Sequence, residues 1–307
     1  MPAEKNPIGF HALNKIEKNT KTTNGKKYSE VFGDWLSKKV EEGDDDLVAI
    51  TPAMSEGSGM NDFAEKNPDK FYDVAIAEQH SMTFAAGLAK EGKKPILAIY
   101  STFLQRAYDQ LIHDVALQKL DVTLAIDRAG FVGGDGATHA GIFDVSYLRC
   151  IPNMVIMSPS DENECWKMLS TGYNHSGPAA IRYPRGEGPG TEILKSFDLL
   201  EIGKARVINE ALSDLVIFSF GNMLNVSMEI SDEIGCSLVD MRFIKPLDEE
   251  LIEKYAKTHK YIITIEENVI SGGAGSAVNE YLTKIGYSDK LKICLLYTSD
   301  AADDSLR

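Results

Sequence analysis

The sequence has no long apolar run. Of its 307 residues, 43% are hydrophobic and 25% are charged, and no stretch approaches the roughly 20 apolar residues that a helix needs to cross a bilayer. Residues 1–20 also lack the apolar core of a secretory signal. We therefore expect a soluble globular protein without a membrane partner, located in the cytoplasm.

Basic side chains are scarce. Lys and Arg number 32 against 46 Asp and Glu, which gives a formal net charge of −14. Nucleic acids and anionic membranes are bound by clustered Lys and Arg, so this balance argues against both as partners. An anionic substrate would need a local basic pocket within an acidic protein.

Cysteine is also sparse, and neither cysteine nor histidine is spaced for metal binding. The cysteines are Cys150, Cys165, Cys236 and Cys294, with no CxxC pair, and the 6 histidines are scattered. We expect reduced, structural thiols and no zinc site.

The hydrophobic pattern that is present predicts alternating strands and helices. A helix with one apolar face is expected over 28–42. The strand-like runs that follow lie at 47–51, 71–76, 95–100, 122–127, 154–157 and 179–183. Strands separated by helix-length segments indicate βαβ units, so we predict an α/β fold with a doubly wound, mainly parallel sheet.

The Gly-rich stretch 186–190 predicts a domain boundary, beyond which the alternation restarts. A second, smaller α/β domain is expected, with strands at 215–220, 237–241 and 261–266 and helices near 223–234, 249–257 and 277–285. The predicted organisation is therefore a linker over 1–27, a first domain over 28–190, a second over 191–293, and a separate tail over 294–307.

Glu78 lies where an apolar run, Val74 to Ala77, gives way to a helical pattern. Ligand crevices in open α/β sheets form at the carboxyl ends of strands, which is where this carboxylate is expected. One interpretation is that Glu78 only stabilises the helix, as an anion at its N-terminus. The alternative is that Glu78 is a buried acid that contacts a ligand, because it is placed among Ile76, Phe84 and Ala85 and not in a charged run.

Residues 73–80 (DVAIAEQH) closely resemble the cofactor-activating segment of thiamine-diphosphate enzymes of the transketolase type, in particular the family of 1-deoxy-D-xylulose-5-phosphate synthases. The resemblance covers about residues 2–293. Further segments that resemble the family lie at 49–54, 56–60, 98–110, 125–130, 147–152, 158–164, 182–186, 239–248 and 266–268.

The resemblance implies a thiamine-diphosphate cofactor whose aminopyrimidine is activated by a hydrogen-bonded carboxyl group. Glu78 would be that acid, and Phe103 would stack on the aminopyrimidine. Tyr100 would lie near the substrate and cofactor, with Arg106 beside them. Without the resemblance, an aromatic residue at a strand end is more often part of the core.

For the substrate, the resemblance assigns Arg128 and Arg185 to the phosphate of an acceptor aldehyde, since guanidinium groups bind phosphate bidentately. Surface salt bridges are the alternative for both. His139 would be an active-site histidine that donates a hydrogen bond or a proton near the reacting carbon, with Asp135 beside it.

The loop 133–141, together with Asn163 further along the chain, superficially resembles the motif with which the family binds magnesium and diphosphate. Asp135 lies well past the strand end, however, and helix capping explains Asn163, so we predict no metal ligands in this chain. The Mg²⁺ ligands are expected in a first domain that the sequence lacks. The Gly-rich stretch 271–276 is a weak phosphate-loop candidate, and His80, His113 and His259 are expected to be structural.

The family enzyme condenses pyruvate, with decarboxylation, and D-glyceraldehyde 3-phosphate, for isoprenoid and thiamine synthesis. We expect this chain to be its pyrimidine-binding and C-terminal portion, a homodimer when full-length and inactive alone. The alternatives are a β-type subunit of a keto-acid dehydrogenase or split transketolase, and an incompetent binding fragment. The tail over 294–307 resembles a translated sequencing adapter, so the strand that reaches Ile293 is expected to be interrupted there.

Overall fold

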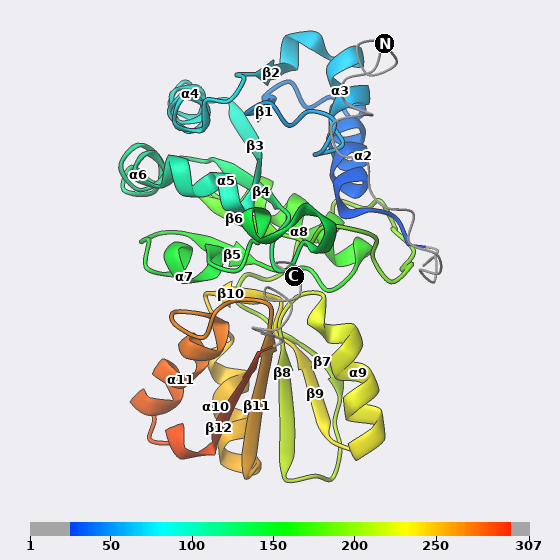
Figure 1. The fold of residues 1–307 in the computed structure, drawn as a ribbon, viewed down its shortest axis with the longest axis vertical. Helices are drawn as coiled ribbons and strands as arrows, with labels where there is room; N and C mark the ends of the chain where they lie inside the picture. The colour runs from blue at the N-terminus through cyan, green and yellow to red at the C-terminus, as the bar shows by residue number, and fades with distance from the viewer. Residues whose placement is uncertain (1–24, 296–307) are drawn as a thin grey trace.

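The structure is a computed structural model, and it describes residues 25–295. Two α/β units lie one above the other, with strand β10 at their junction (Figure 1). Most of the expected linker and of the expected tail lies outside the described residues. Among residues 25–295, no helix is both long and apolar enough to cross a membrane.

The first unit is built on a 7-stranded sheet with the order β10-β5-β6-β4-β3-β1-β2. Every neighbouring pair is parallel except β10 with β5. This confirms the prediction of a doubly wound, mainly parallel sheet. Its strands are β1 (Leu47–Thr51), β2 (Phe71–Asp73), β3 (Lys94–Tyr100), β4 (Thr123–Asp127), β5 (Val155–Met157), β6 (Ala179–Arg182) and β10 (Phe243–Lys245).

Helices cover both faces of this sheet, because alternate residues of each buried strand point to opposite sides. Val48 and Ile50 of β1 join the cluster under α4, α6 and α7, whereas Leu47 and Ala49 pack under α2 and α8. The α-helices are α2 (Tyr28–Glu41), α3 (Asn61–Lys66), α4 (Glu78–Lys90), α5 (Ser101–Leu104), α6 (Tyr108–Gln110), α7 (Asp144–Arg149) and α8 (Glu162–Asn174). Shorter helical turns are η1 (Pro68–Lys70), η2 (Gln105–Ala107), η3 (Leu111–Ala116), η4 (Gly133–Asp135) and η5 (Ala137–His139).

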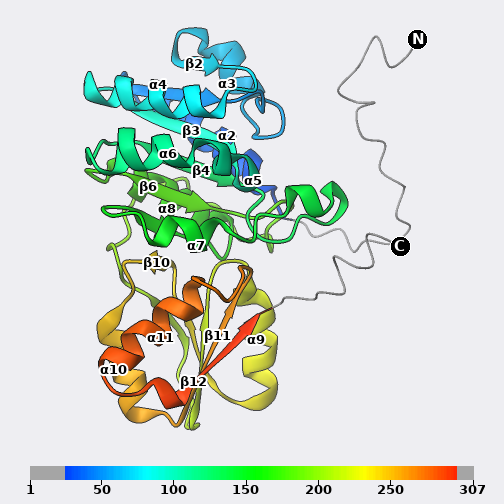
Figure 2. The same ribbon diagram turned by 60° about the vertical axis from the view of Figure 1, so that its left-hand side comes forward.

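The second unit has a 5-stranded sheet with the order β12-β11-β8-β9-β7. Helices α10 and α11 lie on one side of it and α9 on the other (Figures 1 and 2). The elements are β7 (Arg206–Asn209), β8 (Leu215–Ser219), α9 (Met223–Ile234), β9 (Ser237–Asp240), α10 (Glu249–Thr258), β11 (Tyr261–Glu266), α11 (Ala274–Lys284), η6 (Ser288–Lys290) and β12 (Leu291–Leu295). The sequence pattern did not predict β7, which is antiparallel to β9.

The two units are joined by more than the connecting chain. Strand β10 follows β9 in sequence but pairs with β5 of the first sheet. Apolar side chains of α7, among them Val145 and Leu148, belong to the same buried cluster as Val239 and Val278 of the second unit. Since this contact is apolar and continuous, the second unit is positioned firmly against the first.

The strand predicted over 71–76 ends earlier in the structure, so the predicted end was wrong. β2 stops at Asp73, whose Oδ1 accepts hydrogen bonds of 2.9 Å from the backbone N–H groups of Ala53 and Ala75. A carboxylate that bonds the N–H two residues on closes a turn, and Ala75 has a left-handed φ of 57°. Ile76 lies outside the strand and is 78% exposed.

Two further expectations need correction. Helix α8 is capped by Asp161, whose side chain accepts from Glu164 N, whereas Asn163 Oδ1 accepts from Leu194 N at 3.1 Å. The strand expected to stop at Ile293 continues as β12 to Leu295, which pairs with Glu266 of β11. Residues 296–307 of the expected tail lie outside the described residues.

Candidate active site at the carboxyl edge of the first sheet

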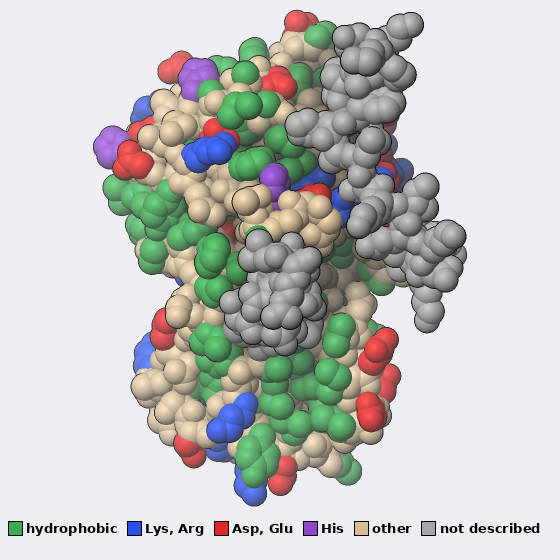
Figure 3. Space-filling view, in the orientation of Figure 1, with side chains coloured by type: hydrophobic (Ala, Val, Ile, Leu, Met, Phe, Trp, Pro, Cys, Tyr) green, Lys and Arg blue, Asp and Glu red, His purple; other side chains and the backbone are tan. Residues whose placement is uncertain are grey.

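The residues singled out in the sequence come from five different segments, yet they meet at one edge of the first sheet. β2, β3, β4 and β6 are parallel through their neighbours, so their carboxyl ends share this edge. Figure 3 shows basic, acidic and histidine side chains together over the region of α5 and β4. The site residues are Glu78, Tyr100, Phe103, Arg106, Arg128, Asp135, His139 and Arg185.

Glu78 is the first residue of α4 and is only 3% exposed. Its Oε1 accepts a 2.5 Å hydrogen bond from Arg106 Nη1, whose side chain is 53% exposed. Among residues 25–295, its other carboxylate oxygen has no hydrogen bond. A buried carboxylate at a helix N-terminus with a free oxygen is a candidate for bonding a ligand.

An aromatic stack extends from Glu78 and Arg106 toward the middle of the edge. The Arg106 guanidinium carbon lies 5.3 Å from the centroid of the Phe103 ring. The Phe103 and Tyr100 rings stack with centroids 5.5 Å apart and 8° between their planes, and the His139 ring meets Phe103 edge-on at 5.5 Å. Burial raises the pKa of the Tyr100 hydroxyl to about 12, so it stays protonated at neutral pH.

The far end of the stack is basic. The Arg128 guanidinium carbon lies 4.2 Å from the Tyr100 centroid. Arg128 Nε and Arg185 Nε approach the same oxygen of Asp135, at 4.0 and 2.9 Å. Two arginines that converge on one carboxylate provide two guanidinium forks in one place, which is the geometry that suits a phosphate.

Sequence reasoning missed Asp127 and Gly57 as parts of this site. Asp127 ends β4, is 1% exposed and pairs with Arg128, while Arg128 Nη1 donates to Gly57 O at 2.8 Å. Burial raises the pKa of Asp127 to about 6, against the opposing effect of Arg128. An acidic residue at a strand end directly before an arginine was the available signal for Asp127.

Three further histidines each contact a neighbouring side chain that is not among the site residues. His80 stacks on Phe84 with centroids 5.9 Å apart, His259 Nε2 lies 3.2 Å from Ser237 Oγ, and His113 Nδ1 lies 2.8 Å from Asp114 Oδ1. The structural role expected for these three histidines stays a prediction. Within the described residues no three His, Cys, Asp or Glu side chains are grouped to hold a metal ion, and the four cysteines are free.

In the stretch 271–276, a side chain already bonds two of the backbone N–H groups that a phosphate would need. The buried Glu266 carboxylate accepts from Ala274 N at 2.8 Å and from Gly275 N at 2.6 Å at the start of α11. A side chain of the protein thus occupies the anion position of this helix N-terminus.

Comparison with known proteins agrees with this arrangement. The family profile "Transketolase, pyrimidine binding domain" matches residues 24–191, and "Transketolase, C-terminal domain" matches residues 203–297. The chain belongs to the transketolase family. The first match contains every residue of the candidate site, whereas the second covers the unit that packs against it.

Within the transketolase family, the chain is similar to curated 1-deoxy-D-xylulose-5-phosphate synthases. It is 56% identical over 291 residues to the Cellvibrio japonicus protein, covering 93% of this chain and 45% of that protein. It is 57% identical over 285 residues to the Marinomonas sp. protein, covering 92% of this chain and 45% of the relative. The chain therefore spans less than half the length of these relatives.

A solved structure titled "Split gene transketolase, inactive beta4 tetramer" is also similar. It has a TM-score of 0.79 and 27% identity, with 92% of this chain and 93% of that chain covered. A chain of this extent thus exists as a separate polypeptide in another member of the transketolase family.

Proposed function

We propose that this chain supplies the pyrimidine-binding and C-terminal portion of a thiamine-diphosphate-dependent transferase of the 1-deoxy-D-xylulose-5-phosphate synthase type. The observation that carries the proposal is the buried Glu78 carboxylate, which stands at a helix start next to the stacked Phe103 and Tyr100 rings. The chain is 55–57% identical to curated synthases but only 27% identical to the split-gene transketolase, and this difference supports the synthase type.

The described residues fit one part of the cofactor, its aminopyrimidine. Glu78 has an oxygen free to bond a ring nitrogen, and Phe103 offers an aromatic face within reach of Arg106. When bound, the cofactor would supply a nucleophilic carbanion and an electron sink for the electron pair that decarboxylation leaves. Glu78 would hold a proton at the pyrimidine nitrogen, and burial from water strengthens that bond.

Binding of the magnesium and the diphosphate is proposed to fall to the part of the relatives that this chain does not span. The reaction would join pyruvate, after loss of carbon dioxide, to D-glyceraldehyde 3-phosphate. His139, in edge contact with Phe103, would exchange a proton with the substrate oxygen, and Asp135 would orient the two arginines. We propose a homodimer in the cytoplasm as the full-length form.

The experiment that tests the function joins this chain to the N-terminal part of the Cellvibrio japonicus relative that it does not match. We expect the hybrid to consume pyruvate and glyceraldehyde 3-phosphate and to release carbon dioxide, and the chain alone to do neither. Product is measured by mass spectrometry. A hybrid that transfers a two-carbon unit from a ketose without decarboxylating pyruvate would support the split-transketolase alternative instead.

Arg185→Ala is expected to raise the KM for glyceraldehyde phosphate in that hybrid by about 10- to 100-fold and to leave the KM for pyruvate unchanged. A charge-assisted hydrogen bond contributes about 1.5–3 kcal/mol, and only the phosphorylated substrate would lose it. Steady-state kinetics with each substrate varied in turn measures the effect.

Arg185 suits this test better than Arg128, because its side chain is 37% exposed whereas that of Arg128 is 16% exposed. Arg128 also bonds Gly57 and Asp127, so its removal would disturb the fold. Lys257→Ala, on the second unit with a side chain 56% exposed, is the control. Equal rises in both KM values for Arg185→Ala would contradict a phosphate-specific role.

A further inference from the structure

The loop that carries Asp135 and His139 is closed at its base by a short neck. Gly130 N donates to Gly141 O at 2.7 Å and Gly141 N donates to Gly130 O at 2.8 Å. The neck is tightly packed, since a Cβ on Gly141 would lie 2.1 Å from Arg128 O. Any movement of the neck is therefore transmitted to Arg128 as well as to the loop.

The neck rests on the second unit, and the side chain that it meets is Glu267, directly after β11. A Cβ on Gly130 would lie 2.6 Å from Glu267 Oε2 and 3.0 Å from its Cδ. Gly130 also has a left-handed φ of 79°. Glycine is thus required at this position both by the backbone and by the closeness of the Glu267 carboxylate.

The Glu267 carboxylate lies at the junction of the two units, against Gly130 of the neck. Burial raises its pKa. Val269, two residues after Glu267, donates its backbone N–H to Ile142 O at 2.9 Å, next to Gly141 on the other side of the neck.

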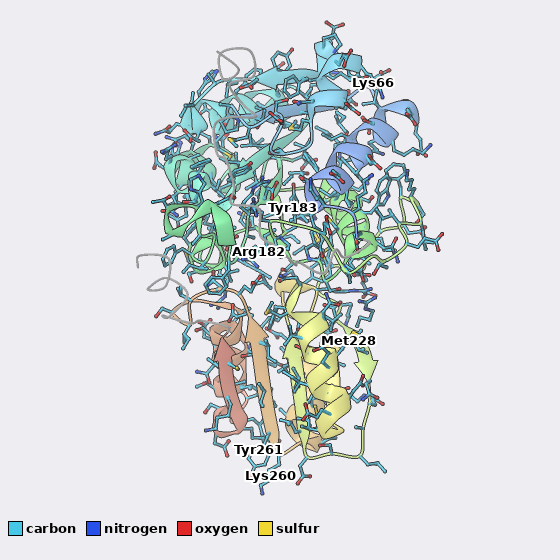
Figure 4. The ribbon with its side chains drawn as sticks, turned by 45° about the vertical axis from the view of Figure 1, so that its right-hand side comes forward. Lys66, Arg182, Tyr183, Met228, Lys260 and Tyr261 are labelled. Carbon is cyan, nitrogen blue, oxygen red and sulfur yellow. The ribbon has the colours of Figure 1, made fainter. Side chains whose placement is uncertain are left out.

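The charged groups that face Glu267 come from the first unit. Arg182, at the end of β6, favours the ionised carboxylate and Asp144 disfavours it. Arg182 is itself bonded to Asp144 at 3.0 Å. Figure 4 shows Arg182 in the lower part of the first unit, close to where the second begins. Glu267 is therefore a half-buried carboxylate at the junction, near the buried Arg182–Asp144 pair.

We propose that Glu267 is a positioning residue, through which the second unit holds the Asp135–His139 loop over the aromatic stack. The role in catalysis rests on the proposed function, whereas the mechanical role of Glu267 does not. Its carboxylate acts as the packing surface for Gly130, beside the hydrogen bond from Val269 N to Ile142 O. The second unit thereby contributes to the site without touching a substrate.

The mechanical role is tested on this chain as it is, by hydrogen–deuterium exchange of peptides that cover 131–140. Glu267→Ala is expected to accelerate exchange there about two- to tenfold, because loss of the carboxylate removes the surface on which Gly130 packs and makes local opening of the loop easier. Glu267→Gln retains a similar volume, so it should exchange like the parent chain. Glu250→Ala, at a side chain 86% exposed on the same unit, is the control.

Exchange that stays unchanged in Glu267→Ala, or that accelerates equally throughout the second unit, would overturn the proposal. Glu267→Asp, which shortens the reach and keeps the charge, serves as the second variant if the alanine chain does not fold. It is expected to accelerate exchange in 131–140 selectively, and parent-like exchange there would count against the proposal in the same way.

The catalytic consequence is tested in the active hybrid with a double-mutant cycle. Glu267→Ala is expected to lower kcat about tenfold in the parent background and to have little further effect when His139 is already alanine. A purely structural role would lower kcat by the same factor in both backgrounds, which would contradict positioning through His139. An inactive hybrid would refute the proposed function and leave the exchange result to decide on Glu267.

Discussion

Glu78→Gln is expected to lower turnover of the active hybrid by about 10²–10⁴-fold, the range that a positioned proton donor contributes. Gln retains the size of the side chain and its hydrogen bond from Arg106, but it cannot hold a proton at a pyrimidine nitrogen as a carboxyl group does. The Glu78 side chain is 4% exposed and bonded to Arg106, so water cannot substitute for it.

Two measurements separate this effect from misfolding. Exchange of the cofactor's C2 proton, followed by NMR, should slow with turnover in Glu78→Gln, whereas the melting temperature should change little. Glu280→Gln, at a side chain 67% exposed on the second unit, should alter neither quantity. C2 exchange at the parent rate in Glu78→Gln would end the assignment of this carboxylate.

Arg182→Met is expected to destabilise the chain by about 3–5 kcal/mol, the cost of removing one partner from a buried ion pair. Arg182 has a side chain 7% exposed, and that of its partner Asp144 is 0% exposed. Methionine fills a similar volume, but Asp144 would remain buried without its cation. Urea unfolding followed by circular dichroism measures the loss.

The pH dependence of this loss follows from two neighbouring carboxyl groups. Burial raises the pKa of Glu266 and of Glu267, and Arg182 opposes both rises. Without Arg182 both pKa values should move further above their unfolded values, so the folded variant binds protons more readily than the unfolded chain. Its stability should therefore recover as pH falls from about 7.5 to about 5.5.

Lys257→Met, at a side chain 56% exposed, should lose less than about 1 kcal/mol, as is usual for exposed ion pairs. An Arg182→Met loss that is small, or that grows as pH falls, would show that the Arg182–Asp144 pair does not stabilise the chain as a buried ion pair.

The sequence alone determined which residues lie at strand ends, because the alternation of short apolar runs with helix-length segments is a local property. That pattern placed Glu78 at a helix start and Arg128 and Arg185 after buried strands, and family resemblance supplied their expected roles. Local reasoning was wrong where a side chain competes with the backbone: Asp73 bonds Ala53 and Ala75 and ends β2 early.

Tertiary structure alone decided which of these residues meet. Arg128 and Arg185 converge on Asp135, and His139 reaches Phe103, only because parallel strands far apart in sequence share one edge. The position of β10 in the first sheet and the contact of Glu267 with Gly130 depend on how the second unit packs. Such long-range contacts are set by crossover connections and buried apolar surface, which no local sequence pattern specifies.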